Sequence, residues 1–243
     1  KEILVLSSRM IRLLLALAVV PTVVAASELP PIEVVNEDSG SRLLVDGEEV
    51  FVKGMNWGYM PIGQNYTYSF WTQKDEVIIA ALAKEMSLLK AMGVNVLRHY
   101  TGMPPRWVEY VYDTYGIYTV LNHTIGRYGL TLDGVWYPNT DYSDPRVRET
   151  LRAEMKAQVA EYKDTPGMLM WMLGNENNYG LSWSSFEIEA LPEGERNAAK
   201  AQYLYSLFGE IIRDIKEIDP DRIVTMANGD LQYIDIIAEE CKG

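Results

Sequence analysis

Short apolar runs alternate with amphipathic segments along most of this chain, and this alternation limits the possible folds more than any other feature of the sequence. The apolar runs have the length of buried strands, and the segments between them carry apolar residues at helical spacing. Strands are expected at 50–57, 94–100, 117–121, 168–173 and 222–227, and helices at 75–92, 104–116, 143–165, 195–218 and 231–240. Strict alternation of this kind predicts an α/β fold with a parallel sheet.

The regular size of these units favours a (β/α)8 TIM barrel over an open doubly wound sheet. A Rossmann fold is disfavoured because no Gly-rich turn follows the first strand. Only five strands are found where a closed barrel needs eight, and the first and fifth strands would otherwise keep unpaired edges. The sequence therefore predicts about the first five βα units of a barrel, that is, an N-terminal fragment of one.

Three regions are expected along the chain. Residues 1–26 hold some upstream residues and a signal peptide that starts near Met10, continues through Arg12 and an apolar stretch, and is cleaved near Ala26. Export to the periplasm, the cell surface or the medium is therefore expected, with no stable membrane span after cleavage. An uncleaved anchor is the alternative, although the apolar stretch is shorter than the roughly 20 residues of a span. Residues 27–49 are expected to form a linker and a small β-hairpin that turns at Asp46-Gly47, and residues 50–243 the truncated barrel.

The composition restricts the partners. Thirty-four acidic against 22 basic residues give a formal charge of -12, which repels phosphate backbones and argues against nucleic acid. Sixteen Tyr and six Trp against four Phe favour rings with a polar group, the kind that lines sites for sugars. The single cysteine, Cys241, excludes an internal disulfide framework and a thiolate metal cluster.

The carboxyl ends of the expected strands hold the candidates for chemistry, because barrels of this kind place their active sites there. The apolar run Met168–Leu173 delivers Asn175 and Glu176, and a carboxyl group held at that point can transfer protons. The other candidates are Asn56, Trp57, Arg98, His99, Tyr100, Asn122, His123, Tyr179, Trp183 and Asn228. Either histidine could bind a substrate or serve the structure alone. No His, Asp and Glu cluster has metal-ligand spacing, so neither a metal nor another cofactor is expected.

Four pieces of sequence, in order on the expected elements, carry a resemblance to a known family. They are Phe51–Asn56, Gly93–Arg98, Tyr112–Tyr118 and Trp171–Glu176. The chain resembles the catalytic domain of the clan A retaining glycoside hydrolases, most closely glycoside hydrolase family 2. This resemblance implies a carbohydrate substrate and Glu176 as the general acid/base. It also implies that Asn175 hydrogen-bonds the hydroxyl next to the anomeric carbon and that Arg98 supports a second carboxylate.

The second carboxylate of such a pair is expected to be missing from this chain. A retaining glycosidase needs a nucleophile about 5 Å from the acid/base, and in the clan it is a Glu at the end of the seventh strand. Glu187, Glu189, Glu193 and Glu195 are expected in a loop, and Asp230 after the fifth strand does not fit the family pattern. The 243 residues alone are therefore expected to have no glycosidase activity.

Two alternatives to a hydrolase remain open. The sequence Arg98-His99-Tyr100-Thr101 also resembles the Arg-x-Tyr of fungal β-1,3-glucan transferases, which would make the chain part of a β-glucan transglycosylase. A carbohydrate-binding or degenerate homologue that lost catalysis is the other alternative. A gene that continues through strands six to eight would favour the enzyme.

Overall fold

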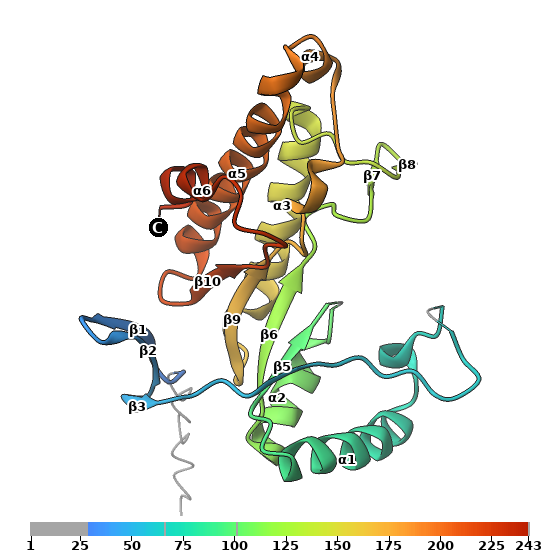
Figure 1. The fold of residues 1–243 in the computed structure, drawn as a ribbon. Coiled ribbons are helices and arrows are strands. Elements are labelled where there is room, and N and C mark those ends of the chain that lie inside the picture. Colours follow the sequence, from blue (N-terminus) through green and yellow to red (C-terminus); the bar gives the residue numbers. More distant parts are fainter. Residues whose placement is uncertain (1–28, 66, 101, 243) are drawn as a thin grey trace, which may run out of the picture.

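The computed structural model describes residues 29–65, 67–100 and 102–242, in which strands and helices alternate (Figure 1). The expected signal peptide lies within residues 1–28, outside the described residues. Within the described ranges, no helix combines the length and the apolar character needed to cross a membrane.

The main sheet has five parallel strands. In chain order they are β4 (Gly54–Asn56), β5 (Val96–His99), β6 (Tyr118–His123), β9 (Met168–Leu173) and β10 (Ile223–Met226). Their order in space, β10-β9-β6-β5-β4, is the same as their order in the chain. Sequential parallel neighbours joined by helices form the wall of a barrel, so the predicted fold class is confirmed.

The helices cover the outer face of this wall. They are α1 (Asp75–Ala91), α2 (Pro105–Tyr115), α3 (Pro145–Tyr162), α5 (Glu193–Ile218) and α6 (Ile234–Glu240). The shorter η1 (Phe70–Thr72) lies between β4 and α1, and η2 (Tyr179–Leu181) and α4 (Phe186–Glu189) lie between β9 and α5. Asp144 caps α3 by accepting a hydrogen bond from the Arg146 amide, and Gly116 ends α2 in the left-handed conformation. Leu97, Leu121 and Trp171 of the strands belong to one core with the buried helix residues.

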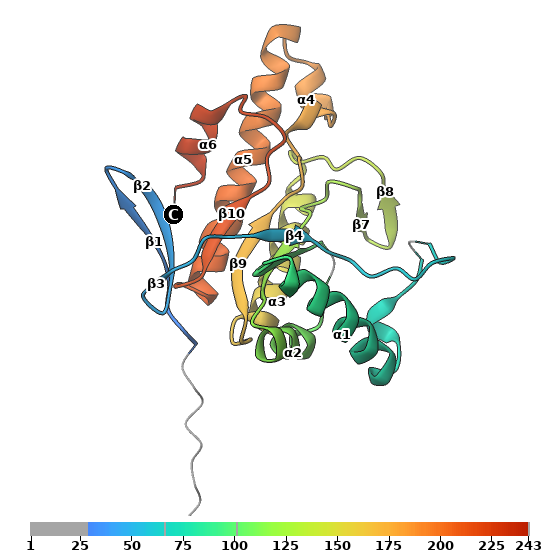
Figure 2. The same ribbon diagram turned by 60° about the horizontal axis from the view of Figure 1, so that its bottom comes forward.

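A separate antiparallel sheet precedes the barrel wall. It consists of β1 (Ile32–Glu37), β2 (Gly40–Val45) and β3 (Glu48–Glu49), and Asp46 and Gly47 make the turn between β2 and β3, both at positive φ. Ile32 and Val45 share a buried cluster with Val96, Val120 and Leu169 of the wall. The small sheet lies beside β10 (Figure 2) and covers the amino-terminal part of the inner face.

The structure differs from the sequence expectations at three places. β4 is only three residues long, and Phe51 before it is 77% exposed, because the chain enters the sheet late. An unexpected hairpin, β7 (Leu130–Leu132) and β8 (Val135–Tyr137), follows β6.

The loop expected to carry four glutamates is the third place, because all four lie in helices; the helix expected from residue 195 is confirmed and begins two residues earlier. Glu187 and Glu189 lie in α4, where the Ser185 hydroxyl accepts a hydrogen bond from the Ile188 amide. Glu193 and Glu195 form the first turn of α5, where the helix dipole favours negative charge.

Candidate active site

A hydrogen-bonded cluster joins the carboxyl ends of β5, β6 and β9. Arg98 Nε donates to Asn122 Oδ1 at 2.9 Å, and Arg98 Nη2 donates to Asn175 Oδ1 at 2.9 Å. The Tyr100 ring lies 4.5 Å from the guanidinium carbon of Arg98, within the range of a cation–π contact. Three predicted site residues are thus in direct contact, and a fourth stacks on them.

Asn122 holds its position through both ends of its carboxamide. Its Nδ2 donates to the carbonyl oxygens of Met172 at 3.1 Å and Gly174 at 2.7 Å. A guanidinium can only donate and a carbonyl can only accept, so these partners leave one possible orientation for the amide. Asn122 is 3% exposed, and its burial makes these bonds a rigid link between β6 and the end of β9.

The backbone after β9 makes a tight turn that presents Glu176. Gly174 has φ 71° and Glu176 has φ 57°, a left-handed conformation that is uncommon for a glutamate. The Glu176 amide donates to the Ala227 carbonyl at 2.8 Å, and the Asn175 amide donates to Asn177 Oδ1 at 2.7 Å. The neighbouring segments therefore hold a strained turn, as is common at functional sites.

Two asparagines that the sequence reading missed anchor this turn. Asn177 Nδ2 donates to the Ile125 carbonyl at 2.9 Å and to the Tyr142 hydroxyl at 2.8 Å. Asn178 Oδ1 accepts from the Gly229 amide at 2.7 Å, and both asparagines are buried. The polar run that continues past Glu176 was the available signal, because buried asparagines so close to a strand end need specific partners.

The Glu176 side chain is exposed and lies beside the segment that follows β10. A Cβ added to Gly229 would lie 3.2 Å from the Glu176 Cβ. Asn228, the residue before, accepts a hydrogen bond of 3.4 Å from the Tyr205 hydroxyl. Tyr179 is 61% exposed, and its amide donates to the Glu176 carbonyl. Glu176 and Tyr179 therefore lie against Gly229, the residue that follows Asn228.

Asn56 completes the inner side of the site. It pairs in register with Arg98 in the parallel β4–β5 ladder. Both residues line a hollow of about 300 Å³ on the inner face of the sheet. The other lining residues are Val52, Gly54, Met55, Val96, Val120, Met170 and Met172. The polar cluster therefore stands above an apolar floor.

Four of the predicted site residues do not face this cluster. Trp57 and His99 are buried, with their rings 5.9 Å apart, in an aromatic group with Phe70 and Trp71. Trp183 is also buried, and its ring packs edge-on against Tyr142. Because these rings are buried, they pack in the protein interior and present no exposed face on which a sugar could stack.

His123 is the fourth of these residues. Its Nδ1 accepts from the Ile125 amide, and its Nε2 lies 3.6 Å from a Glu154 carboxylate oxygen on α3. Successive side chains of a strand point to opposite faces, so Asn122 faces inward and His123 faces the helices.

Tyr128 was not predicted as a site residue, but it touches the cluster directly. Asn175 Nδ2 donates to its hydroxyl at 2.5 Å.

Among the described residues, no group of three His, Cys, Asp or Glu side chains could hold a metal ion.

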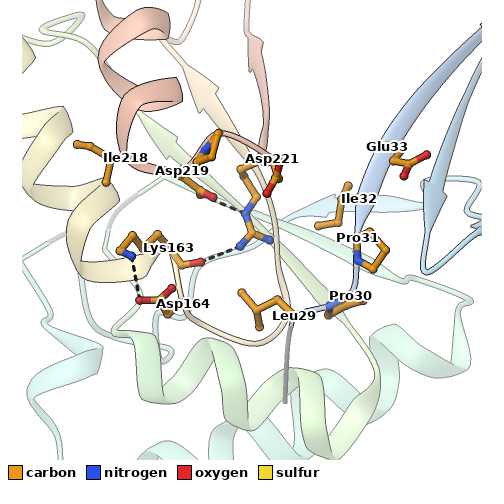
Figure 3. Close-up of a pocket in the computed structure, with 12 residues that line it drawn as sticks. Leu29, Pro30, Pro31, Ile32, Glu33, Lys163, Asp164, Ile218, Asp219 and Asp221 are labelled. Carbon is orange, nitrogen blue, oxygen red and sulfur yellow. Dashed lines mark hydrogen bonds and ion pairs between the residues drawn. The ribbon is translucent and has the colours of Figure 1, made fainter. Parts of the chain in front are cut away.

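A larger hollow of about 550 Å³ lies at the opposite ends of the strands (Figure 3). Leu29–Glu33, Lys163-Asp164 and Ile218–Arg222 line it. Buried Arg222 binds Asp219 at 3.2 Å and donates to the carbonyls of Lys163 and Met168. Its hydrogen bonds tie the amino ends of β9 and β10 together, far from Glu176.

Comparison with known proteins identifies relatives of this chain. Residues 75–242 match the family described as glycosyl hydrolases family 2, TIM barrel domain. The β-galactosidase of Lactococcus lactis subsp. lactis (strain IL1403) is 28% identical over 141 residues, which make up 57% of this chain and 12% of that enzyme. This chain thus spans about one eighth of that relative.

Solved structures of low sequence identity share the fold. Bacteroides uniformis β-glucuronidase 2 gives a TM-score of 0.57 at 14% identity and covers 85% of this chain and 21% of its own. The β-1,4-D-mannanase from Cryptopygus antarcticus gives a TM-score of 0.58 at 14% identity, and the match covers 82% of this chain and 61% of the mannanase chain. At such identities the likeness concerns the fold alone.

Proposed function

Because this chain belongs to glycosyl hydrolases family 2 through its TIM barrel domain, we propose that it carries the acid/base half of a glycoside hydrolase site. The reaction is hydrolysis of O-glycosidic bonds in a β-linked oligo- or polysaccharide. One observation carries the assignment: Asn175, held by Arg98 across the sheet, directly precedes an exposed carboxyl group at the end of β9.

The proposed mechanism is a retaining double displacement. In the first step Glu176, in its acid form, gives its proton to the glycosidic oxygen while a carboxylate nucleophile attacks the anomeric carbon and the carbon–oxygen bond breaks. In the second step the Glu176 carboxylate takes a proton from water, and that water attacks the anomeric carbon and releases the enzyme carboxylate. An exposed Glu176 can reach both the leaving group and the water.

We propose that the nucleophile lies outside this chain, because the one acidic residue near the end of β10 is engaged in holding the loop that carries it. Asp230, the acidic residue that follows β10, accepts hydrogen bonds from Asn178 Nδ2 at 3.2 Å and from the Gln232 amide at 2.9 Å. We therefore propose that the 243 residues alone do not hydrolyse glycosides. Turnover of an aryl glycoside by this chain, lost in Glu176→Gln, would refute that part of the proposal.

The substrate class follows from the relatives only as a proposal. The curated relative named above is a β-galactosidase, and one structural neighbour is a β-glucuronidase. We propose a β-D-hexopyranoside, with aryl β-galactosides and aryl β-glucuronides as the first substrates to assay.

The acid/base role can be tested in the full reading frame that contains this chain. Glu176→Gln should lower kcat/KM about 10³-fold for aryl glycosides with poor leaving groups, within the usual range for a general acid. It should lower kcat/KM much less for a dinitrophenyl glycoside, which leaves without a proton. Glu187→Gln, which alters an exposed glutamate of α4, should keep wild-type rates. An equal loss for all leaving groups would contradict the assignment.

The two alternatives remain predictions and can be decided in the same assay. A β-glucan transglycosylase would transfer the glycosyl group to an added sugar in preference to water. A carbohydrate-binding homologue would bind the sugars without turnover.

We also propose export by the signal peptide within residues 1–26. N-terminal sequencing of the mature protein should give Ser27 as its first residue. A mature protein that retains residues 10–26 would instead support the membrane anchor.

A further inference from the structure

The orientation of the Asn175 carboxamide depends on two partners. Its Oδ1 accepts from Arg98, which can only donate, so its Nδ2 must face Tyr128. The Tyr128 oxygen therefore accepts this bond, and one Nδ2 hydrogen of Asn175 remains for another acceptor. The amide cannot rotate by half a turn without placing Nδ2 against the Arg98 guanidinium.

The segment that carries Tyr128 is built to stay in place. Gly126 has φ +67°, and a Cβ there would lie 2.8 Å from Thr140 Oγ1, while the Thr140 hydroxyl donates to the Gly126 carbonyl. Gly129 has φ +105°, and a Cβ there would lie 2.6 Å from the Tyr137 carbonyl oxygen and 2.9 Å from Trp136 Nε1. Both glycines allow close packing that fixes the loop on each side of Tyr128.

The Tyr128 ring itself is 62% exposed. Burial in the core therefore does not explain its position. Its hydroxyl accepts a hydrogen bond from Asn175, the residue next to the proposed acid/base. In a chain where Asn175 recognises a sugar, this contact and the bond from Arg98 together set the direction of the second Nδ2 hydrogen.

We propose that Tyr128 is a positioning residue for sugar recognition, which holds the Asn175 carboxamide so that its free Nδ2 hydrogen meets the hydroxyl next to the anomeric carbon. The inference rests on the proposed function, because it assigns Asn175 to that hydroxyl. The ligand class is a β-D-hexopyranoside with a free hydroxyl at this carbon.

The test compares two sugars that differ only in that hydroxyl. Methyl β-D-galactopyranoside and its 2-deoxy analogue are titrated into the 243-residue chain, and their dissociation constants are measured by NMR. Tyr128→Phe removes only the phenol oxygen. Tyr137→Phe removes a hydroxyl from an exposed ring on β8, in the hairpin that follows the Tyr128 loop, and serves as the control.

Tyr128→Phe should weaken binding of the parent sugar about five- to tenfold, which corresponds to the usual net free energy of one hydrogen bond. Binding of the 2-deoxy sugar should change less than about twofold, and Tyr137→Phe should change neither. The side-chain amide resonances of Asn175 should shift in Tyr128→Phe, with an unchanged melting temperature.

Two results would overturn the inference. One is an equal loss for both sugars, and the other is an unchanged affinity for the parent sugar in Tyr128→Phe. If the wild-type chain binds neither galactoside nor the corresponding glucuronide, the proposed function of this site fails, and the inference fails with it.

Discussion

Arg98 at the end of β5 donates a hydrogen bond of 2.9 Å to the carboxamide oxygen of Asn175 beyond the end of β9. These two strands are not neighbours, because β6 lies between them, and its Asn122 accepts from the same guanidinium. One side chain thus ties three strands together directly below the proposed acid/base. Residues held by strands are positioned more accurately than residues carried on free loops.

Replacing Arg98 by lysine should break this link. Lysine keeps the charge but lacks the planar fork that reaches both asparagines. In the full reading frame, Arg98→Lys should lower kcat/KM by about 10²-fold, because a misplaced site loses its near-attack geometry. Arg42→Lys, in an exposed ion pair of the small sheet, should leave kcat/KM unchanged. Similar rates for both variants would show that Arg98 does not position the site.

Asn122→Asp tests the assigned amide orientation. Aspartate has nearly the same shape, but it places an acceptor against the carbonyls of Met172 and Gly174, which now receive hydrogen bonds. The free energy of unfolding, measured with urea, should fall by about 2 kcal/mol, even though the new carboxylate faces Arg98. The exposed Asn139 provides the matched change, and Asn139→Asp should alter stability by less than about 0.5 kcal/mol.

Two glycines of α5 should respond oppositely to alanine. A Cβ on Gly209 would overlap the backbone carbonyl of Glu240 in α6, whereas a Cβ on Gly194 would meet nothing within 4 Å. Gly194→Ala should leave stability unchanged or raise it by up to about 1 kcal/mol, because alanine favours the helix. Gly209→Ala should lower stability by about 1–3 kcal/mol and speed amide exchange in α6. Equal effects of the two substitutions on stability would contradict the packing of α6 against Gly209.

The lowered pKa of Asp214 predicts that the protein loses stability in acid. Burial opposes its ionisation, but hydrogen bonds from Arg152 and Lys156 on α3 outweigh that effect and lower the pKa of Asp214. A carboxyl whose pKa is lower in the folded state stabilises the protein at neutral pH, and this contribution disappears as the pH falls below about 4.

Unfolding free energies between pH 3 and 7 can measure this effect. Asp214→Asn should lower stability by about 3 kcal/mol at pH 7 and flatten the acid dependence, because it leaves two cations without their buried partner. Asp38→Asn, in an exposed turn, should follow the wild-type curve. A wild-type curve in Asp214→Asn would contradict the assignment.

The hydrophobic pattern, together with the glycine and proline residues that interrupt it, was enough to predict most of the fold. β9 occupies the predicted residues 168–173, because a continuous apolar run lies there between Gly167 and Gly174. The β7–β8 hairpin was missed although Asp133-Gly134, both at positive φ, is a common hairpin turn. Both strands are only three residues long, and β8 is exposed throughout, so neither leaves a clear hydrophobic pattern.

The site could be predicted only in part, because the strand pleat separates adjacent residues. Asn122 and His123 were both expected at the site, but only one of two neighbours on a strand can face inward. Tyr128 could not be found from the sequence, since its contact with Asn175 depends on how the loop between β6 and β7 folds back.

The acid/base role of Glu176 is tested most directly by azide rescue of Glu176→Ala, in the full reading frame, with a dinitrophenyl β-glycoside as substrate. Azide needs no general base to attack a glycosyl-enzyme, so it should replace the missing second step. Azide should raise kcat of Glu176→Ala at least about tenfold, leave the wild-type rate unchanged, and yield the β-glycosyl azide. No acceleration, or an α-glycosyl azide, would contradict Glu176 as the acid/base of a retaining enzyme.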